Sequence, residues 1–313
     1  MTNLSEFTFL SSDGKTQLHG MLWEPEGVAV RAVLQICHGV AEHIARYDGF
    51  ARALNEQGFA VAGHDHLGHG KSLPEGGTPV YFGDGNTWNT VVDDIYVLHQ
   101  RLKQRYPDVP LCIMGHSMGS FLTRTYLIRY PGTVKAAVIM GTGWQPRAAI
   151  TGGLALANAI AAVSGENATS ELVTELAFGS YNKLFAPNRT KVDWLSADES
   201  NVDDYIADPL CGADATVGLF RQMLHGIRFN QRQSHLRQMD REMPVLFVAG
   251  DKDPVGSCGK GVRQTYDAFR AAGMRDCTLK LYPGLRHEIL NEKAYTADIT
   301  KNIEAWLLSR LEK

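Results

Sequence analysis

The sequence lacks the features by which several classes of protein are recognised. Its five cysteines are odd in number and include no Cys-x-x-Cys pair. We therefore expect neither a disulfide framework nor a thiolate zinc site, and a reducing compartment is the simpler interpretation. No lysine- or arginine-rich run occurs, and the formal net charge is −3. This balance gives no reason to expect nucleic acid or an anionic membrane as a partner.

The sequence also predicts no targeting segment. The first ten residues are polar and show no basic and apolar sections of a signal peptide. The longest apolar run, Ala148 to Val163, is interrupted by Thr151 and Asn158. It is shorter than the roughly 20 residues that a membrane helix needs. With 44% hydrophobic and 21% charged residues, the chain has the composition of a soluble globular protein, and we expect it in the cytoplasm.

Short apolar runs alternate with helical stretches along most of the chain. After a predicted hairpin over residues 6–23, strands are predicted at 32–37, 59–63, 111–114, 134–140, 244–248 and 277–282. Helical spacing follows most of these strands, which predicts an α/β fold with a mostly parallel sheet covered on both faces. The alternation stops at Gly141. We predict a core of residues 1–143 and 237–313, with residues 144–236 inserted as a helical cap.

One motif in this framework predicts a nucleophile. The strand at 111–114 leads into Gly115-His116-Ser117-Met118-Gly119, and a helical pattern follows at once. A Gly-x-Ser-x-Gly sequence between a strand and a helix is the nucleophile elbow of the α/β-hydrolase fold. The serine sits in a strained turn with its hydroxyl projecting out, and the glycines avoid collisions with neighbouring backbone. Ser117 is therefore the predicted nucleophile.

The elbow serine requires a general base and an acid that orients it. In this fold the acid and then the histidine follow the serine along the chain, each on a loop after a later strand. The strand near residue 248 is followed by Asp251 and Asp253, and we choose Asp253 because Pro254 stiffens its turn. Asp251 is the alternative. His287 follows the last predicted strand and is the predicted base.

The loop after strand 32–37 is predicted to complete an oxyanion hole. It begins His38-Gly39-Val40. A backbone N–H from this loop, together with the N–H after the nucleophile, stabilises the charge that develops in acyl transfer. We assign these donors to Val40 and Met118.

Charged residues follow directly in the same loop. Glu42, His43 and Arg46 could fix the loop through a buried ion pair or could touch the head group of a substrate. We favour the structural role, because a loop that donates a backbone N–H must be rigid.

A second histidine-rich segment admits two other interpretations. His64, His66 and His69 nearly match a metallo-β-lactamase pattern, but Gly68 stands where the aspartate ligand belongs. The end of this segment imitates a P-loop, yet Asp65 occupies the position of its first glycine and would repel phosphate. A turn-rich loop packed under the site is the simpler interpretation, and no metal or other cofactor is expected.

Three motifs together resemble one family. They are HGVAEH…RY from residue 38, DHLGHGKS from residue 65 and GHSMG from residue 115. They are similar to those of the monoacylglycerol lipase and lysophospholipase family, which is often grouped with serine aminopeptidase-like hydrolases. The resemblance covers nearly the whole chain and is weakest in residues 144–236. Familiar eukaryotic members have glycine where this chain has Ala41.

The resemblance implies a serine hydrolase that cleaves carboxylic esters of small lipids, monoacylglycerols or lysophospholipids, through an acyl-enzyme. The alternatives are a broad short-chain or aryl carboxylesterase and a peptidase-like amidase. A metal-dependent hydrolase using the His64 segment and a catalytically silent ligand-binding protein are the remaining hypotheses. The apolar run in the cap could pack in the cap's own core, form a dimer contact, line an acyl-chain site or rest on a membrane or micelle. The sequence leaves the oligomeric state open.

Overall fold

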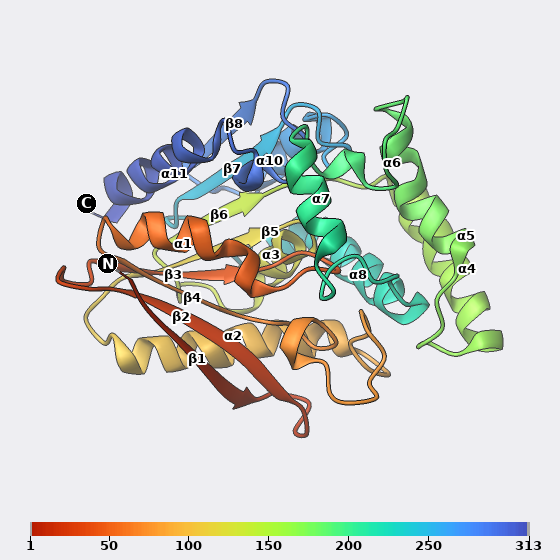
Figure 1. The fold of residues 1–313 in the computed structure, drawn as a ribbon, viewed down its shortest axis with the longest axis horizontal. Coiled ribbons are helices and arrows are strands. Elements are labelled where there is room, and N and C mark those ends of the chain that lie inside the picture. The colour runs from red at the N-terminus through yellow and green to blue at the C-terminus, as the bar shows by residue number, and fades with distance from the viewer. Residues whose placement is uncertain (1, 312–313) are drawn as a thin grey trace.

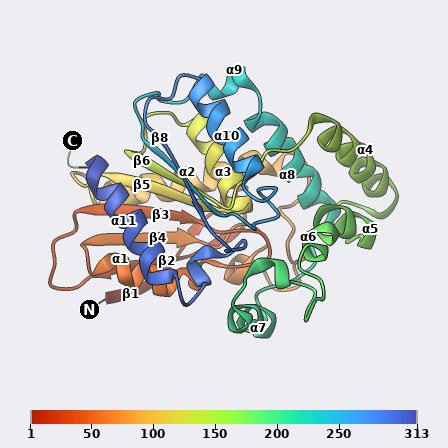
Figure 2. The ribbon, with the colours of Figure 1, turned by 90° about the horizontal axis from the view of Figure 1, so that it is seen from above.

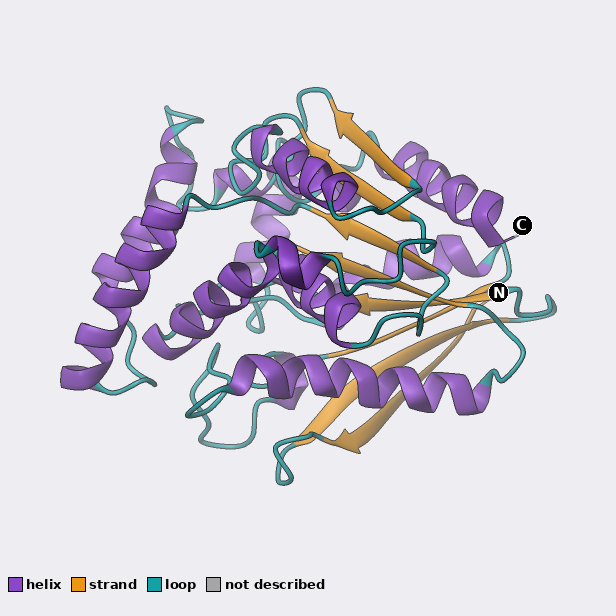
Figure 3. Ribbon diagram, turned by 180° about the vertical axis from the view of Figure 1, so that it is seen from behind, coloured by secondary structure: helices purple, strands orange, loops and turns teal. Residues whose placement is uncertain are grey.

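The computed structural model describes residues 2–311 and contains an eight-stranded sheet with helices on both faces (Figures 1 and 3). In the sheet the strands are ordered β1-β2-β4-β3-β5-β6-β7-β8. The strands are β1 (Thr2–Leu10), β2 (Gln17–Pro25), β3 (Ala32–Cys37), β4 (Phe59–His64), β5 (Leu111–His116), β6 (Ala136–Met140), β7 (Val245–Gly250) and β8 (Cys277–Tyr282).

Strand direction divides the sheet into two parts. β1 pairs with β2, and β2 with β4, in antiparallel fashion, whereas the neighbours from β4 to β8 are parallel. The first hairpin closes at Asp13, whose side chain accepts hydrogen bonds from the backbone N–H groups of Lys15 and Thr16, both at 2.8 Å. Since parallel strands end at the same edge, the loops after β3, β5, β7 and β8 meet there.

Two hydrophobic cores lie on opposite sides of the sheet. Because side chains alternate along a strand, Val33 of β3 faces one core and Leu34 the other. The core on the Leu34 side is closed by α1 (Asp48–Asn55) and α11 (Thr296–Leu311). The opposite core is closed by α2 (Thr87–Arg105), α3 (Met118–Arg129) and α10 (Lys260–Ala271).

The segment between β6 and β7 is helical. It holds α4 (Arg147–Ser164), α5 (Glu171–Thr174), a π-helical stretch (Glu175–Gly179), α6 (Ser180–Lys183), α7 (Glu199–Ala207), α8 (Val217–Asn230) and α9 (Gln233–Leu236). We call residues 144–236 the cap, and these bounds stay a prediction. Figure 2 shows α4 to α7 gathered on one side of the molecule, opposite the two termini.

Helix α4 contains the apolar run of the cap. Its buried residues Ile150, Leu154 and Ala157 lie on one face, which packs against α8. Gly153 leaves room there for Leu224, since a Cβ at this glycine would come within 2.9 Å of the leucine. The sequence predicts a run too short for a membrane span. However, the 18-residue helix α4 is long and apolar enough to cross a membrane, judged by length and composition alone. Only 17% of it is buried in the structure.

Candidate active site

The turn between β5 and α3 has the geometry of a nucleophile elbow. Ser117 has φ 54° and ψ −123°, in a region that residues other than glycine seldom adopt. A Cβ on Gly115 would lie 2.2 Å from the carbonyl oxygen of Gly119, and one on Gly119 would lie 2.0 Å from that of Cys37. Both glycines are therefore required for the tight packing of α3 against the ends of β5 and β3.

Asp253 and His287 form a buried pair at the same edge of the sheet. Their exposed fractions are 0% and 2%, and His287 Nδ1 lies 3.0 Å from Asp253 Oδ1. The same carboxylate oxygen accepts the backbone N–H of Val255 at 2.9 Å. Asp251 lies elsewhere, because its side chain accepts the backbone N–H of Gly284 at 2.8 Å. Of the two candidate acids, the structure brings only Asp253 to His287.

Two atoms of this pair have no partner. Within residues 2–311, neither Nε2 of His287 nor Oδ2 of Asp253 makes a hydrogen bond, although both atoms are buried. Orienting His287 through Nδ1 leaves Nε2 as the nitrogen able to accept a proton. A buried polar atom without a hydrogen-bond partner lowers the stability of the fold, so its presence here suits an atom that takes part in catalysis.

The turn that carries Ser117 reaches this pair through His116. The His116 ring is 4.7 Å from the His287 ring between centroids, and Ser117 is the next residue. A Cβ on Gly39 would come within 3.0 Å of the Ser117 Cβ, so the loop after β3 reaches the same point. In the described part of the chain, no hydrogen bond joins Ser117 to His287. Hydroxyl and imidazole often tighten only around substrate.

The backbone N–H groups of the two predicted oxyanion donors are available to a ligand. Among the described residues, neither the N–H of Val40 nor that of Met118 donates a hydrogen bond. Met118 is the first residue of α3, where helix geometry leaves the N–H unpaired. His38 fixes the start of the loop, because its Nδ1 lies 2.7 Å from the Gly39 carbonyl oxygen and its Nε2 accepts the backbone N–H of His66 at 2.9 Å.

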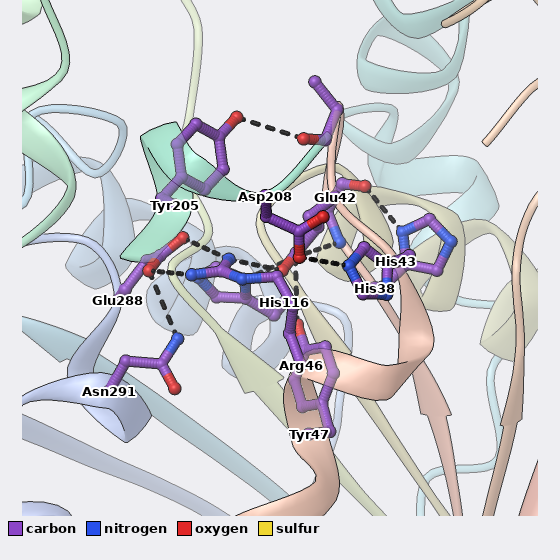
Figure 4. Close-up of polar contacts among 12 residues, drawn as sticks. His38, Glu42, His43, Arg46, Tyr47, His116, Tyr205, Asp208, Glu288 and Asn291 are labelled. Atoms are coloured by element: carbon purple, nitrogen blue, oxygen red, sulfur yellow. Dashed lines mark hydrogen bonds and ion pairs between the residues drawn. The ribbon is translucent and has the colours of Figure 1, made fainter. Parts of the chain in front are cut away.

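Glu42 and Arg46 belong to a buried network of charges (Figure 4). Glu42 Oε1 accepts the backbone N–H of Gly39 at 2.5 Å, and Glu42 Oε2 accepts Arg46 Nη1 at 2.9 Å. Arg46 also donates to both oxygens of Glu288, at 2.6 and 2.8 Å. On the other side of Glu42, His116 Nδ1 lies 3.2 Å from Oε1. The loop that carries Val40 is thus tied to the residue after His287.

The electrostatics of this network favour the charged forms of its groups. Burial alone would raise the pKa of Glu42, but the neighbouring His116 and Arg46 hold that pKa well below its usual range. Burial likewise opposes ionisation of Glu288, yet the Arg46 guanidinium lowers the pKa of this carboxyl. For His116, burial favours the neutral ring, and the hydrogen bond and charge of Glu42 outweigh it and raise the pKa.

His43 points toward the cap. Its Nε2 lies 2.8 Å from Asp208 Oδ2 (Figure 4). Nearby, the Ala41 carbonyl oxygen accepts the Tyr205 hydroxyl and the backbone N–H of Gly212, both at 3.0 Å. The oxyanion loop is therefore held from the core by Glu42 and from the cap by residues 205–212.

The histidine-rich segment supports the oxyanion loop from below. Asp65 accepts the backbone N–H groups of Ile44 at 2.8 Å and Lys71 at 2.9 Å, and its Oδ2 lies 2.9 Å from His19 Nδ1. His64 is fully buried, and burial lowers its pKa to about 3. In the described residues, neither nitrogen of the His64 ring has a partner.

Aromatic side chains of the cap reach the histidine. Trp194 lies 5.2 Å from the His287 ring between centroids, and Phe178 stacks on Trp194 at 6.2 Å. Tyr181 packs edge-on against Trp194 at 5.2 Å. The backbone N–H of Glu288 donates to the carbonyl oxygen of Leu195 at 2.8 Å, which anchors this part of the cap to the His287 loop. An apolar wall therefore stands beside the pair.

Comparison with known proteins assigns this architecture to a family. Residues 28–294 match the family described as serine aminopeptidase, S33. The chain belongs to this family. It is 31% identical to a monoacylglycerol lipase of Mycolicibacterium smegmatis, over 98% of both chains. It is also 28% identical to a monoglyceride lipase of Mus musculus, over 96% of this chain and 90% of the relative.

Solved structures agree with the family assignment. A thermostable carboxyl esterase from Bacillus coagulans, determined in complex with glycerol, superposes with a TM-score of 0.92 at 26% identity. The match covers 99% of this chain and 100% of the esterase. These findings confirm both the α/β-hydrolase fold and the family expected from the sequence.

Sequence reasoning missed several residues of this serine aminopeptidase-like site. Glu288 is adjacent to His287, so its position beside the predicted base was a usable signal. Tyr205 lies in α7, Trp194 in a short 3-10 helix, and Asp208 directly after α7. No periodic pattern in the sequence indicates that these side chains face the site. Only the folded chain shows that they reach the site.

Proposed function

We propose that this chain hydrolyses monoacylglycerols or lysophospholipids, with Ser117 as nucleophile and His287 and Asp253 as base and acid. The observation that carries the proposal is a serine in a strained elbow beside a buried histidine–aspartate pair whose Nε2 is unpartnered. Ester hydrolysis is also what its similar relatives are named for.

In the first half of the reaction, Ser117 Oγ attacks the ester carbonyl carbon while His287 Nε2 takes the hydroxyl proton. The backbone N–H groups of Val40 and Met118 stabilise the resulting oxyanion. Asp253 holds the imidazole orientation and stabilises its charged form. Collapse breaks the carbon–oxygen bond of the leaving alcohol, which receives the proton from His287, and leaves an acyl-serine.

Water completes the cycle by the same route. His287 removes a proton from the water, which attacks the acyl carbon, and a second oxyanion forms in the same place. Its collapse returns the proton to Ser117 Oγ and releases the carboxylic acid. No step requires a metal or a cofactor.

The cap supports an apolar acyl group as the preferred substrate part. Phe178, Tyr181 and Trp194 form an aromatic cluster that meets His287. Such surfaces bind hydrocarbon chains by removing apolar area from water. The likeness to a carboxyl esterase supports the second candidate, a broad short-chain or aryl esterase.

A labelling experiment tests the mechanism, and a substrate panel tests the specificity. A fluorophosphonate probe is expected to label the wild type and a Ser234→Ala control, and not Ser117→Ala. Labelling that survives Ser117→Ala would contradict the mechanism. Turnover is expected to be fastest with monoacylglycerols or lysophospholipids, slower with p-nitrophenyl esters and slowest with aminoacyl amides. Equal rates on short aryl esters and lipids would favour the second candidate.

The cellular location of the protein and its contact with a membrane or micelle form a separate part of the proposal. A cytoplasmic location is supported by the five cysteines, which are all unpaired in the structure. Contact of the cap with a membrane or micelle is supported by four exposed apolar residues on its outer helices and the turns beside them: Val163, Leu172, Leu176 and Leu184. Co-sedimentation with phosphatidylcholine vesicles tests it, and a Leu172→Ser, Leu176→Ser double variant is expected to stay in the supernatant.

A further inference from the structure

A second cluster of reactive side chains lies where the cap meets the oxyanion loop. It comprises His43 from that loop and Asp208 and Cys211 from the turn after α7. One ligand atom of each residue lies within 4.8 Å of the others. Asp208 stands in the middle, because its Oδ2 is 2.8 Å from His43 Nε2 and its backbone carbonyl oxygen accepts the N–H of Cys211 at 3.0 Å.

The three donor types suit a thiophilic divalent cation. An imidazole nitrogen, a carboxylate oxygen and a thiolate are the ligands of zinc, which prefers four ligands at about 2.0–2.3 Å in a tetrahedron. Ligand atoms in such a tetrahedron stand roughly 3.3–3.8 Å apart, whereas these three atoms lie within 4.8 Å of one another. Small side-chain adjustments would bring them around one ion, and water would supply the fourth ligand.

The cluster is accessible and well ordered. His43 is buried, whereas Asp208 and Cys211 are half-buried, and 28% of the Asp208 side chain is exposed, which gives an ion a route from solvent. Asp208 also orders its own turn, because its Oδ1 accepts the backbone N–H of Leu210 at 2.9 Å. Little reorganisation is needed to bind.

We propose that His43, Asp208 and Cys211 form a binding site for zinc or a similar thiophilic divalent ion. The ion replaces the thiol proton, which is released to solvent, and the proton on His43 Nε2, which passes to Nδ1 of the same ring. It links the cap turn 208–212 to the loop that carries Val40. This site takes no part in the proposed hydrolysis. It offers a means for metal ions to rigidify the junction of cap and core.

Cobalt absorption tests the site directly and without substrate. The full chain, reduced and freed of metal with a chelator, is titrated with Co²⁺. We expect a thiolate-to-cobalt charge-transfer band in the near ultraviolet that saturates at one equivalent and disappears when Zn²⁺ is added. Cys211→Ser is expected to lose the band and to bind Co²⁺ at least tenfold more weakly. Cys258→Ser is the matched control, since Cys258 is an exposed free cysteine outside the cluster, and it is expected to keep the band.

Thermal unfolding gives an independent measurement. Zn²⁺ is expected to raise the melting temperature of the wild type and of Cys258→Ser, and to leave that of Cys211→Ser unchanged. Circular dichroism of the metal-free Cys211→Ser variant checks that it folds. The proposal is overturned if the wild type shows no thiolate band, if the band survives Cys211→Ser, or if Cys258→Ser abolishes it. Because all of these readouts are made without ester, they stand or fall separately from the proposed hydrolase activity.

Discussion

Two buried clusters at the end of the sheet differ in how fully their polar atoms are bonded. The pair of His287 and Asp253 leaves one nitrogen and one oxygen unpartnered among the described residues. In the network of Glu42, Arg46 and Glu288, each carboxylate oxygen accepts at least one hydrogen bond. The clusters are joined by one peptide bond, between residues 287 and 288. Nevertheless, the pair keeps buried polar atoms without hydrogen bonds, whereas the carboxylate oxygens of the network are all bonded.

This difference indicates that the pair of His287 and Asp253 acts in catalysis, whereas the network around Arg46 holds the structure in place. A buried polar atom without a partner costs roughly 1–3 kcal/mol, so its retention suits an atom that a substrate or a proton will occupy. A saturated charge network has no free site to offer and instead fixes its neighbours. We therefore expect changes in the pair to reduce rate, and changes in the network to reduce stability.

The largest effect is expected from Asp253→Asn. An asparagine cannot stabilise the imidazolium and favours the wrong tautomer of His287, so kcat should fall by roughly 10⁴-fold. The free energy of unfolding should change far less. Steady-state hydrolysis of a monoacylglycerol measures the rate, and Asp251→Asn is the control because Asp251 bonds the backbone N–H of Gly284 instead. An equal loss in the control would show that the acid has been assigned to the wrong residue.

Arg46→Met is expected to break the network instead. It leaves Glu42 and Glu288 buried without their cation, and removal of one partner of a buried ion pair costs roughly 3–5 kcal/mol. Urea unfolding measures this loss. Arg52→Met is the matched control, because Arg52 pairs with Asp48 at the surface and such pairs contribute about 0–1 kcal/mol.

One outcome would remove the distinction between the two clusters. If Arg46→Met lowered kcat as strongly as Asp253→Asn while leaving the unfolding free energy unchanged, the saturated network would act in chemistry. The Arg52→Met control separates that result from a general effect of losing a surface charge.

Unpartnered buried atoms outside the pair provide a stricter test. Burial lowers the pKa of His64 and that of His69 to about 3, since both rings are sealed from water. Above about pH 7.5 both rings are neutral in the folded and unfolded chains, and they place no pH dependence on stability. Below it the unfolded chain takes up protons that the folded chain refuses, so stability is lost as the pH falls toward 3.

The expected slope is large enough to measure. Two such histidines lower the free energy of unfolding by roughly 2.7 kcal/mol per pH unit between about pH 5.5 and 4. Urea unfolding across that range gives the slope, and His64→Leu should reduce it by roughly 1.4 kcal/mol per pH unit. An unchanged slope in His64→Leu would mean that this ring is protonated in the folded protein. It would then not be a passive core residue.

The sheet was largely predictable because its signals are local. The strands β3 and β8 have the predicted bounds, and the other parallel strands differ from theirs by one or two residues at an end. Buried parallel strands are short apolar runs bounded by turns, so each can be recognised alone. The elbow and the two later loops followed from chain order within that sheet.

The cap was predictable only as a helical region. Which of its side chains reach the core depends on how α4, α7 and α8 pack, and that information is not periodic in the sequence. Trp194 beside His287 and Asp208 beside His43 are therefore contacts that only the folded chain reveals. The partner of Arg46 was missed for the same reason, because Glu288 is 242 residues away along the chain.

The smallest effect is expected at Ala41, where the oxyanion loop meets the cap. Its φ of 53° lies in the left-handed region, which costs an alanine roughly 1 kcal/mol. Ala41→Gly removes that strain but adds a similar conformational entropy to the unfolded chain, so stability should change by less than about 0.5 kcal/mol. Ser257→Gly, at an exposed residue with φ 49°, is the matched control. If Ala41→Gly alone lowered kcat severalfold at unchanged stability, the alanine would hold the oxyanion loop in place, and rigidity there would depend on a single methyl group as well as on the saturated network.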